Sequence, residues 1–93
     1  MRTIKFTNRF KRDYRREKSG KHGKKLDSLF EEIVNLLAED KPLPPNAVDH
    51  SLTGTFNDCR DCHIKPDLIL IYRKTDKNEL ELIRLGSHSV LGL

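Results

Sequence analysis

The clearest periodic signal in the chain is helical and lies between Lys24 and Glu39. Apolar residues there follow the 3.6-residue repeat of a helix that buries one face: Leu26, Leu29, Phe30, Ile33, Val34 and Leu37. The opposite face is acidic and carries Glu31 and Glu32. Prolines at positions 42, 44 and 45 follow, and because proline interrupts a helix they predict an extended linker after it.

A strand and another helix are predicted upstream. Residues 3–6 alternate between polar and apolar side chains, which is typical of a short strand. Thr7 then offers an N-cap to a helix along which Phe6, Phe10 and Tyr14 recur every four residues. Glycines separate this helix from the next one.

The C-terminal half predicts three strands, at residues 59–64, 68–73 and 79–85. The segment 68–71 is apolar at every position, so we expect this strand at the centre of the sheet with both faces covered. The resulting order, β-α-α-β-β-β, predicts an α+β fold in a single domain over residues 1–93. Two N-terminal helices are expected to pack on one face of a small antiparallel sheet.

Charge divides the chain into a basic start and an acidic remainder. Apolar residues make up 35% and charged residues 34%, which predicts a thin core and one polar face. The first 25 residues carry eleven Lys or Arg against two acidic residues, a net charge of +9 within a total of +4. Such a segment favours a polyanionic partner, most often nucleic acid, and a solvated helix face is the alternative. The candidate RNA-contacting residues in this arm are Arg12, Arg15, Arg16 and Lys18.

No apolar run reaches the length of a signal peptide or a membrane span. We therefore expect a cytoplasmic protein without a membrane partner. In a reducing compartment the two cysteines are expected to be free thiols.

The segment Cys59-Arg60-Asp61-Cys62-His63 matches the C-x-x-C-H pattern of covalent haem attachment. On a strand successive side chains point to opposite faces, which would send Cys62 to one side and Cys59 and His63 to the other. The same divergence opposes a structural zinc site built from Cys59, Cys62, His50 and His63. We expect neither a cofactor nor a metal, and a haem or zinc protein is kept as an alternative.

Polar residues that are unusual for strands gather in the C-terminal half: His50, Arg60, Asp61, His63, Asp67, Arg84 and His88. Two neighbouring histidines can serve as base and acid near neutral pH, and arginine can bind a phosphate whose charge rises in the transition state. This chemistry suits metal-free RNA cleavage. Regular alternation along the last strand would put Arg84 on the core side with Leu82, so a bulge or strand end is predicted near Ile83.

Three ordered motifs carry a family resemblance. They are Asp49-His50-Ser51-Leu52-Thr53-Gly54, then the segment from Arg60 to Tyr72, and then Arg84-Leu85-Gly86-Ser87-His88. Together they fit D-H-x-L-x-G, R-[DE]-x-H-x-x-P-D-x-x-L-x-Y and R-x-G-[ST]-H. The chain thereby resembles YafQ-type toxins of bacterial toxin-antitoxin pairs, within the RelE/ParE superfamily.

The resemblance implies an endoribonuclease toxin that cleaves mRNA in the ribosomal A site without a metal and is bound by a cognate antitoxin of the RelB/DinJ type. By motif match the catalytic positions are His50, His63, Asp67, Arg84 and His88, with Arg60 as a basic position beside them. The alternative is a toxin of the same fold that acts by binding alone, as gyrase inhibitors of the ParE type do.

Two positions depart from the pattern of many relatives. An aromatic residue often follows the Pro-Asp pair, where this chain has Leu68, and another often lies four residues after the final histidine, where it has Gly92. Such aromatics could stack on mRNA bases. Their replacement predicts weaker cleavage or a different sequence preference.

Overall fold

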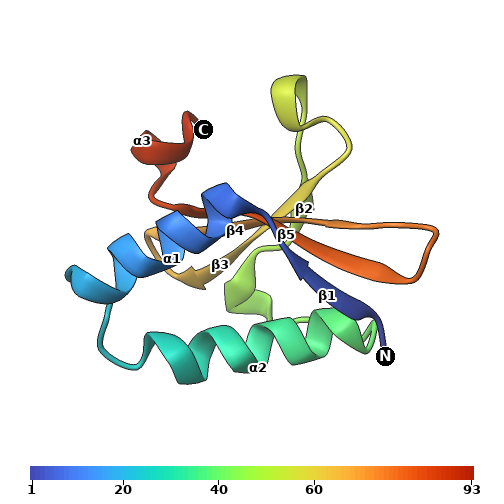
Figure 1. The fold of residues 1–93 in the computed structure, drawn as a ribbon, viewed down its shortest axis with the longest axis horizontal. Helices are drawn as coiled ribbons and strands as arrows, with labels where there is room; N and C mark the ends of the chain where they lie inside the picture. The colour runs from blue at the N-terminus through green and yellow to red at the C-terminus, as the bar shows by residue number, and fades with distance from the viewer.

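The fold is α+β, as predicted, and Figure 1 shows its helices and strands. The computed structural model describes residues 1–93. The elements in chain order are β1 (Thr3–Phe6), α1 (Asn8–Ser19), α2 (Leu26–Ala38), the 3-10 turn η1 (Pro45–Ala47), β2 (His50–Ser51), the 3-10 turn η2 (Gly54–Phe56), β3 (Arg60–Lys65), β4 (Leu68–Lys74), β5 (Glu79–Gly86) and α3 (His88–Leu91). None of the helices has the length and apolar content needed to cross a membrane.

The five strands form one sheet in the order β1-β5-β4-β3-β2. Strands β2, β3, β4 and β5 pair antiparallel to one another. In contrast, β1 joins β5 in parallel at the edge, so the sheet is mixed rather than purely antiparallel as predicted. Both helices lie between β1 and β5 in the sequence, so no short turn forces these two strands to run in opposite directions.

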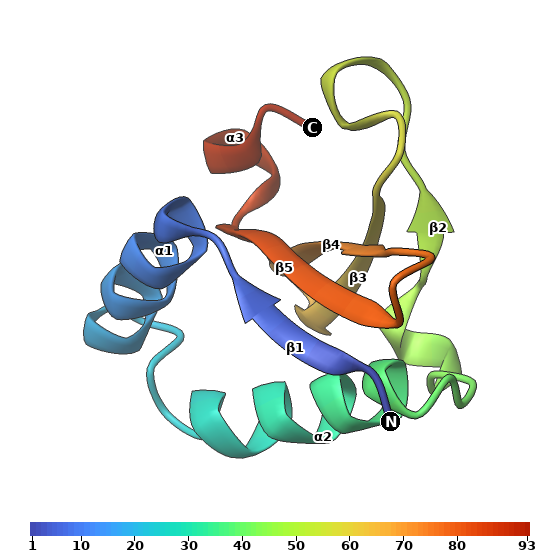
Figure 2. The same ribbon diagram turned by 45° about the vertical axis from the view of Figure 1, so that its right-hand side comes forward.

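Apolar side chains cover both faces of β4. Leu70 and Tyr72 belong to the larger core, beneath α1 and α2. Ile69 and Ile71 point the other way, into a smaller cluster with Cys59 and Leu91. Figure 2 shows α2 below the sheet and α3 above it. The prediction of a central strand with both faces covered is confirmed.

The start of α1 is fixed as the sequence predicted. The Thr7 hydroxyl oxygen accepts a hydrogen bond from the backbone N–H of Phe10 at 2.9 Å, which is the N-cap interaction. The same hydroxyl donates to the carbonyl of Ile83 at 2.8 Å and so ties the helix to β5. Beyond α1, a Cβ at Gly23 would lie 2.1 Å from the carbonyl oxygen of Lys18, so the close turn between the helices requires glycine.

A bulge in β5 decides which way Arg84 points. Arg84 pairs with Ile71 of β4, whereas the next pair along is Leu82 with Tyr72, so Ile83 is the extra residue. Leu82 therefore packs in the helix-covered core, while Arg84 moves to the opposite face. The predicted bulge near Ile83 is confirmed.

Candidate functional site

Two histidines and an aspartate from three separate segments meet at one end of the sheet. The rings of His63, on β3, and His88, at the start of α3, lie edge to face with centroids 5.5 Å apart. Asp67 lies in the turn between β3 and β4, and its Oδ1 is 3.5 Å from His88 Nδ1. The Ser87 side chain caps α3 by accepting from the backbone N–H of Val90, which fixes where His88 begins the helix.

His50 reaches the same face from β2. It pairs in register with Asp61 of β3, and its Nδ1 lies 2.9 Å from Asp61 Oδ1. That nitrogen also lies 3.1 Å from the carbonyl oxygen of Val48, and Asp61 Oδ1 has no well-aligned hydrogen bond. The His50–Asp61 contact is therefore a close approach of two polar atoms rather than a directed hydrogen bond.

Asp61 is a buried carboxyl beneath the histidines, with 2% of its surface exposed. Burial raises its pKa, because a charged carboxylate is poorly solvated there. The positive charges that oppose this rise belong to His50, His63 and His88. Asp61 was not among the predicted catalytic positions, although strand alternation does place it on the same face as His63.

Arg84 lies beside the site but is already paired. Its Nε is 2.6 Å from Asp13 Oδ2 and its Nη2 is 3.2 Å from Asp13 Oδ1. Asp13 also accepts from the backbone N–H of Leu85 at 3.0 Å and from Arg16 Nη1 at 2.9 Å. Burial would raise the pKa of Asp13, but the hydrogen bonds from Arg84, Leu85 and Arg16 outweigh it and hold the pKa below its ordinary value. This network fixes the direction of the Arg84 guanidinium.

The predicted RNA-contacting residues differ in how freely they can meet a phosphate. Arg12 and Arg15 are exposed and have no ion-pair partner in the chain. Arg16 instead binds Asp13, Glu17 and the carbonyl of Leu85. Lys18 pairs with Asp27 at 2.8 Å, and Arg60 with Asp49 at 3.2 Å.

The two cysteines of the C-x-x-C-H segment lie on opposite faces of the sheet. Cys62 packs in the helix-covered core, and Cys59 packs in the cluster on the other side. Both are free thiols, as predicted. Burial raises the pKa of Cys59 to about 11, with a further contribution from Asp58, and burial also raises the pKa of Cys62. The predicted divergence, which opposes a shared haem or zinc site, is confirmed.

A hollow of about 580 Å³ borders the site on the face that carries Arg84. Its lining is Arg9, Thr53, Gly54, Thr55, Phe56, Arg84, Ser89, Val90, Leu91, Gly92 and Leu93. A Cβ at Gly92 would meet no atom within 4 Å, so this position leaves the hollow open. Leu68, in contrast, is fully buried in the helix-covered core. The two departures from the family pattern therefore have different surroundings.

The arrangement supplies the groups that phosphodiester cleavage by proton transfer needs. Imidazoles can accept and donate protons near neutral pH, and a guanidinium can stabilise charge on phosphate oxygens. Sequence reasoning located these groups but missed the network around Asp13, because that residue lies 71 positions from Arg84. The one sequence feature that pointed to Asp13 is that an acidic residue lies there within a basic helix.

Comparisons with known proteins find relatives that cover nearly the whole chain. The mRNA interferase toxin YafQ of Escherichia coli is 36% identical over 91 residues, which cover 97% of this chain and 95% of the relative. The E. coli DinJ-YafQ toxin-antitoxin complex contains a chain with a TM-score of 0.81 and 32% identity, covering 97% of this chain and 96% of that one. A copper-bound mutant toxin from Helicobacter pylori has a TM-score of 0.85 and 36% identity, covering 98% and 99%.

A family model described as the bacterial toxin YafQ of type II toxin-antitoxin systems matches residues 2–92. The match spans nearly the whole chain and includes the residues of the candidate site: His50, Asp61, His63, Asp67, Arg84 and His88. The chain belongs to the YafQ family of type II toxin-antitoxin toxins.

Proposed function

We propose that this chain is an endoribonuclease that cleaves mRNA on the ribosome by acid–base catalysis without a metal. The observation that carries the proposal is the contact between His63 and His88 beside Asp67, above the buried Asp61. Binding alone does not need histidines gathered from three segments. The E. coli relative that covers almost the whole chain is itself named an mRNA interferase.

The reaction uses the RNA's own 2′-hydroxyl as the nucleophile. A base removes the 2′-proton, the 2′-oxygen bonds to phosphorus, and the bond from phosphorus to the 5′-oxygen breaks. An acid protonates the departing 5′-oxygen, so the products are a 2′,3′-cyclic phosphate and a 5′-hydroxyl. The charge that develops on the non-bridging oxygens requires a cation.

We assign His88 as the acid and either His50 or His63 as the base. His88 is half exposed and begins a four-residue helix after β5, so it can approach a bound phosphate from the open side. Asp67 Oδ1 lies 3.5 Å from His88 Nδ1, close enough to orient the imidazole ring. Arg84 is the phosphate clamp, held in place by Asp13, and Arg60 is a possible second cation.

Two macromolecular partners follow from the proposal. The unpaired Arg12 and Arg15 on α1 would contact ribosomal RNA or the mRNA backbone. A cognate antitoxin of the RelB/DinJ type would neutralise the toxin, since the E. coli relative has been crystallised with the antitoxin DinJ. Base recognition would involve the hollow next to Arg84 rather than position 68, which is buried.

Mapping of RNA ends tests the proposal directly. The purified chain is added to ribosomes programmed with a defined mRNA, to the same mRNA alone, and to both after treatment with EDTA on preformed complexes. We expect cleavage on the ribosome, with 2′,3′-cyclic phosphate and 5′-hydroxyl ends and no effect of EDTA on the chemical step. Products with 5′-phosphates, or cleavage that depends on added metal, would contradict it. Inhibition of DNA gyrase without RNA cleavage would instead support the binding-only alternative.

A further inference from the structure

One histidine of the candidate site lies on the shortest strand of the sheet. His50 belongs to β2, which has two residues and forms one edge of the sheet. His63, in contrast, lies within the six residues of β3, and the Ser87 side chain caps the helix that begins with His88. The register of β2 with β3 consists of two residue pairs. A strand this short has few hydrogen bonds of its own, so another contact is needed to hold its side chains in one arrangement.

That contact comes from Asp49, the residue before His50. The Asp49 carboxylate accepts a hydrogen bond of 2.6 Å from the Tyr72 hydroxyl and one of 3.2 Å from Arg60 Nε. Tyr72 lies on β4, the central strand, and has 1% of its surface exposed. Burial and the neighbouring Asp49 carboxylate raise the pKa of Tyr72, so the hydroxyl keeps its proton and remains a donor. Asp49 therefore links the edge of the sheet to its centre.

The alternation of side chains along a strand extends the effect of this link to His50. Successive side chains point to opposite faces of a sheet. Asp49 contacts Tyr72, which belongs to the helix-covered core, whereas His50 pairs in register with Asp61 on the opposite face. The hydrogen bond that holds Asp49 on the core face therefore holds His50 on the face of the candidate site.

The backbone just before Asp49 is strained. Val48 adopts the left-handed conformation, with φ 47° and ψ 56°, which is unfavourable for a β-branched residue. Its side chain is exposed, so burial does not offset this strain. Strained backbone persists only where neighbouring contacts hold it, and the hydrogen bond between Asp49 and Tyr72 is the adjacent one.

The strained turn has a direct contact with the His50 ring. It places the Val48 carbonyl oxygen 3.1 Å from His50 Nδ1. When Nδ1 donates its hydrogen to that oxygen, the lone pair of the neutral imidazole is left on Nε2. An imidazole in this tautomer has a defined nitrogen with which to accept a proton from RNA.

We propose that Asp49 and Tyr72 are positioning residues for His50. Their hydrogen bond holds the strained turn at Val48, and the carbonyl of that turn fixes the tautomer and the direction of the imidazole ring. Both residues act through His50 and take no part in proton transfer themselves. The inference rests on the proposed function, in which His50 is one of the two candidate bases. A link that only stabilises the edge of the sheet is the competing account.

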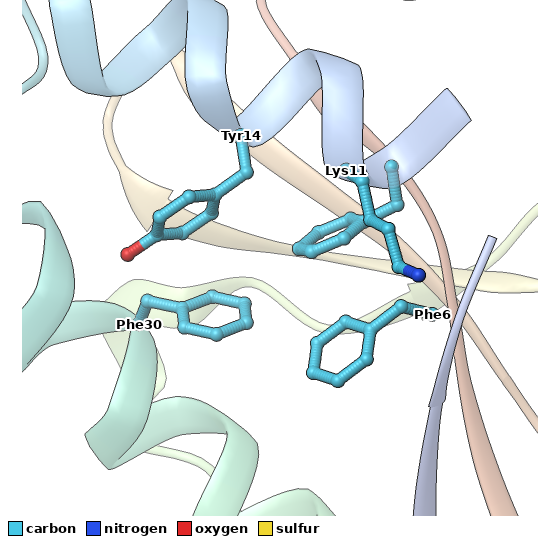
Figure 3. A pocket seen from close by; sticks show the side chains of 5 residues that line it. Phe6, Lys11, Tyr14 and Phe30 are labelled. Carbon is cyan, nitrogen blue, oxygen red and sulfur yellow. The ribbon is translucent and has the colours of Figure 1, made fainter. Parts of the chain in front are cut away.

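The test compares Tyr72→Phe with Tyr14→Phe as the matched control. Each change removes one hydroxyl that donates to an aspartate, since Tyr14 donates to Asp27. Figure 3 shows Tyr14 beside Phe30, between α1 and α2, in an aromatic hollow whose residues do not belong to the histidine site. We expect Tyr72→Phe to slow single-turnover cleavage on saturated ribosomes by about tenfold without changing ribosome affinity, because a misplaced base transfers protons less often. Tyr14→Phe should cleave at the unaltered rate, and circular dichroism checks that both variants are folded.

Two further readouts distinguish positioning from stabilisation. Added to His50→Ala, the change Tyr72→Phe should slow cleavage no further, whereas a purely structural role predicts that the two losses multiply. Nitrogen NMR at about pH 8, where imidazole is ordinarily neutral, should show His50 protonated at Nδ1 in the unaltered chain and a mixture of tautomers in Tyr72→Phe. Asp49→Asn, which keeps an oxygen to accept from Tyr72, should retain more activity than Asp49→Ala.

The outcomes separate this inference from the proposed function. The positioning role is wrong, and the endoribonuclease stands, if Tyr72→Phe cleaves at the unaltered rate or slows the His50→Ala chain as much as the unaltered one. Equal slowing by Tyr14→Phe would also overturn it. If the unaltered chain cleaves no RNA, the proposed function fails, and the NMR measurement still decides the positioning role. A His50 tautomer that Tyr72→Phe leaves unchanged would then rule it out.

Discussion

Asp13 and Arg84 are joined by two hydrogen bonds, of 2.6 and 3.2 Å, across 71 positions of the sequence. The pair connects the middle of α1 to the end of β5, next to the histidine site. Asp13 has 3% of its surface exposed, so its charge depends on the surrounding donors for stabilisation. Helix α1 therefore holds the Arg84 guanidinium in place through Asp13, in addition to any contact that the helix makes with RNA.

Replacement of Asp13 by Asn should destabilise the fold in a pH-dependent way. The pKa of Asp13 is lower in the folded chain than in the unfolded one, so its stabilisation is complete above the unfolded value and is lost as pH falls through the folded value. At pH 7 we expect Asp13→Asn to cost about 3 kcal/mol, because Arg84 loses its charged partner. Urea unfolding of the unaltered chain and of Asp13→Asn, measured from pH 7 to pH 3, should show that the difference in their free energies of unfolding shrinks below about pH 4. A difference that stays constant over this pH range would contradict the account.

Replacement of Asp61 by Asn should slow cleavage without lowering the stability of the fold. Burial raises the pKa of Asp61, so the folded chain binds more protons than the unfolded one just above pH 4, and stability falls as pH rises through that range. Asp61→Asn removes this penalty, and we expect equal or greater stability at pH 7. Cleavage should slow by roughly ten- to a hundredfold, because His50 loses the carboxylate whose Oδ1 lies 2.9 Å from its Nδ1. A shifted pH–rate profile would distinguish this effect from a general loss of structure.

Replacement of His88 by Ala should remove the acid and leave the rest of the molecule intact. Its side chain is half exposed, so the melting temperature should change little. We expect the single-turnover cleavage rate to fall by about a hundredfold or more, while ribosome and antitoxin binding persist. His50→Ala and His63→Ala should each slow cleavage, and less severely if one can replace the other. A wild-type rate for His88→Ala would rule out the assigned role.

Neutralising Arg12 and Arg15 together should weaken ribosome association and flatten its dependence on salt. Each exposed arginine near a phosphate releases counterions, so the slope of log affinity against log salt should fall by roughly 1 to 2. The cleavage rate of the bound complex should not change. Lys77→Ala, far from α1 in the sequence, is the control. Adding Arg16→Ala should also lower stability, because Arg16 binds Asp13 and β5.

The two cysteines should differ in their effect on stability and not on cleavage. Cys62 is fully buried in the helix-covered core, so Cys62→Ser places a hydroxyl there and should cost about 1–3 kcal/mol. Cys59 lies in the smaller cluster, and Cys59→Ser should cost less. Thermal unfolding measures the difference, and cleavage assays should show both variants active. A Soret band in the purified protein would contradict the divergent placement of the two thiols.

The sequence predicted the elements that depend on neighbouring residues. The spacing of Leu26, Ile33 and Leu37 marks α2, Thr7 marks the start of α1, and the unbroken apolar run marks β4. Even the bulge at Ile83 was predictable, since a polar Arg84 could not share a face with Leu82. Each of these follows from local period and burial.

Local sequence patterns could not predict which strands and side chains pair across long stretches of the sequence. The parallel pairing of β1 with β5 depends on how the helices pack, and the two-residue strand at His50 is too short to have a period. The candidate catalytic positions came from motif resemblance, whereas the contacts of Asp61 and Asp13 exist only in the folded chain. Counting charges also overestimated how many basic side chains of the N-terminal arm are free to bind a phosphate, because Arg16 and Lys18 form ion pairs within the chain.

The place of β5 within the sheet has a consequence for newly made toxin. This strand lies between β1 and β4, yet it is the last strand to leave the ribosome during synthesis. Until it emerges, β1 has no partner, Arg84 cannot meet Asp13, and His88 has not reached His63. We therefore expect a nascent chain to lack both the Asp13–Arg84 pair and the His63–His88 contact until β5 has emerged. The cell has that interval in which an antitoxin can be ready before the first competent molecule folds.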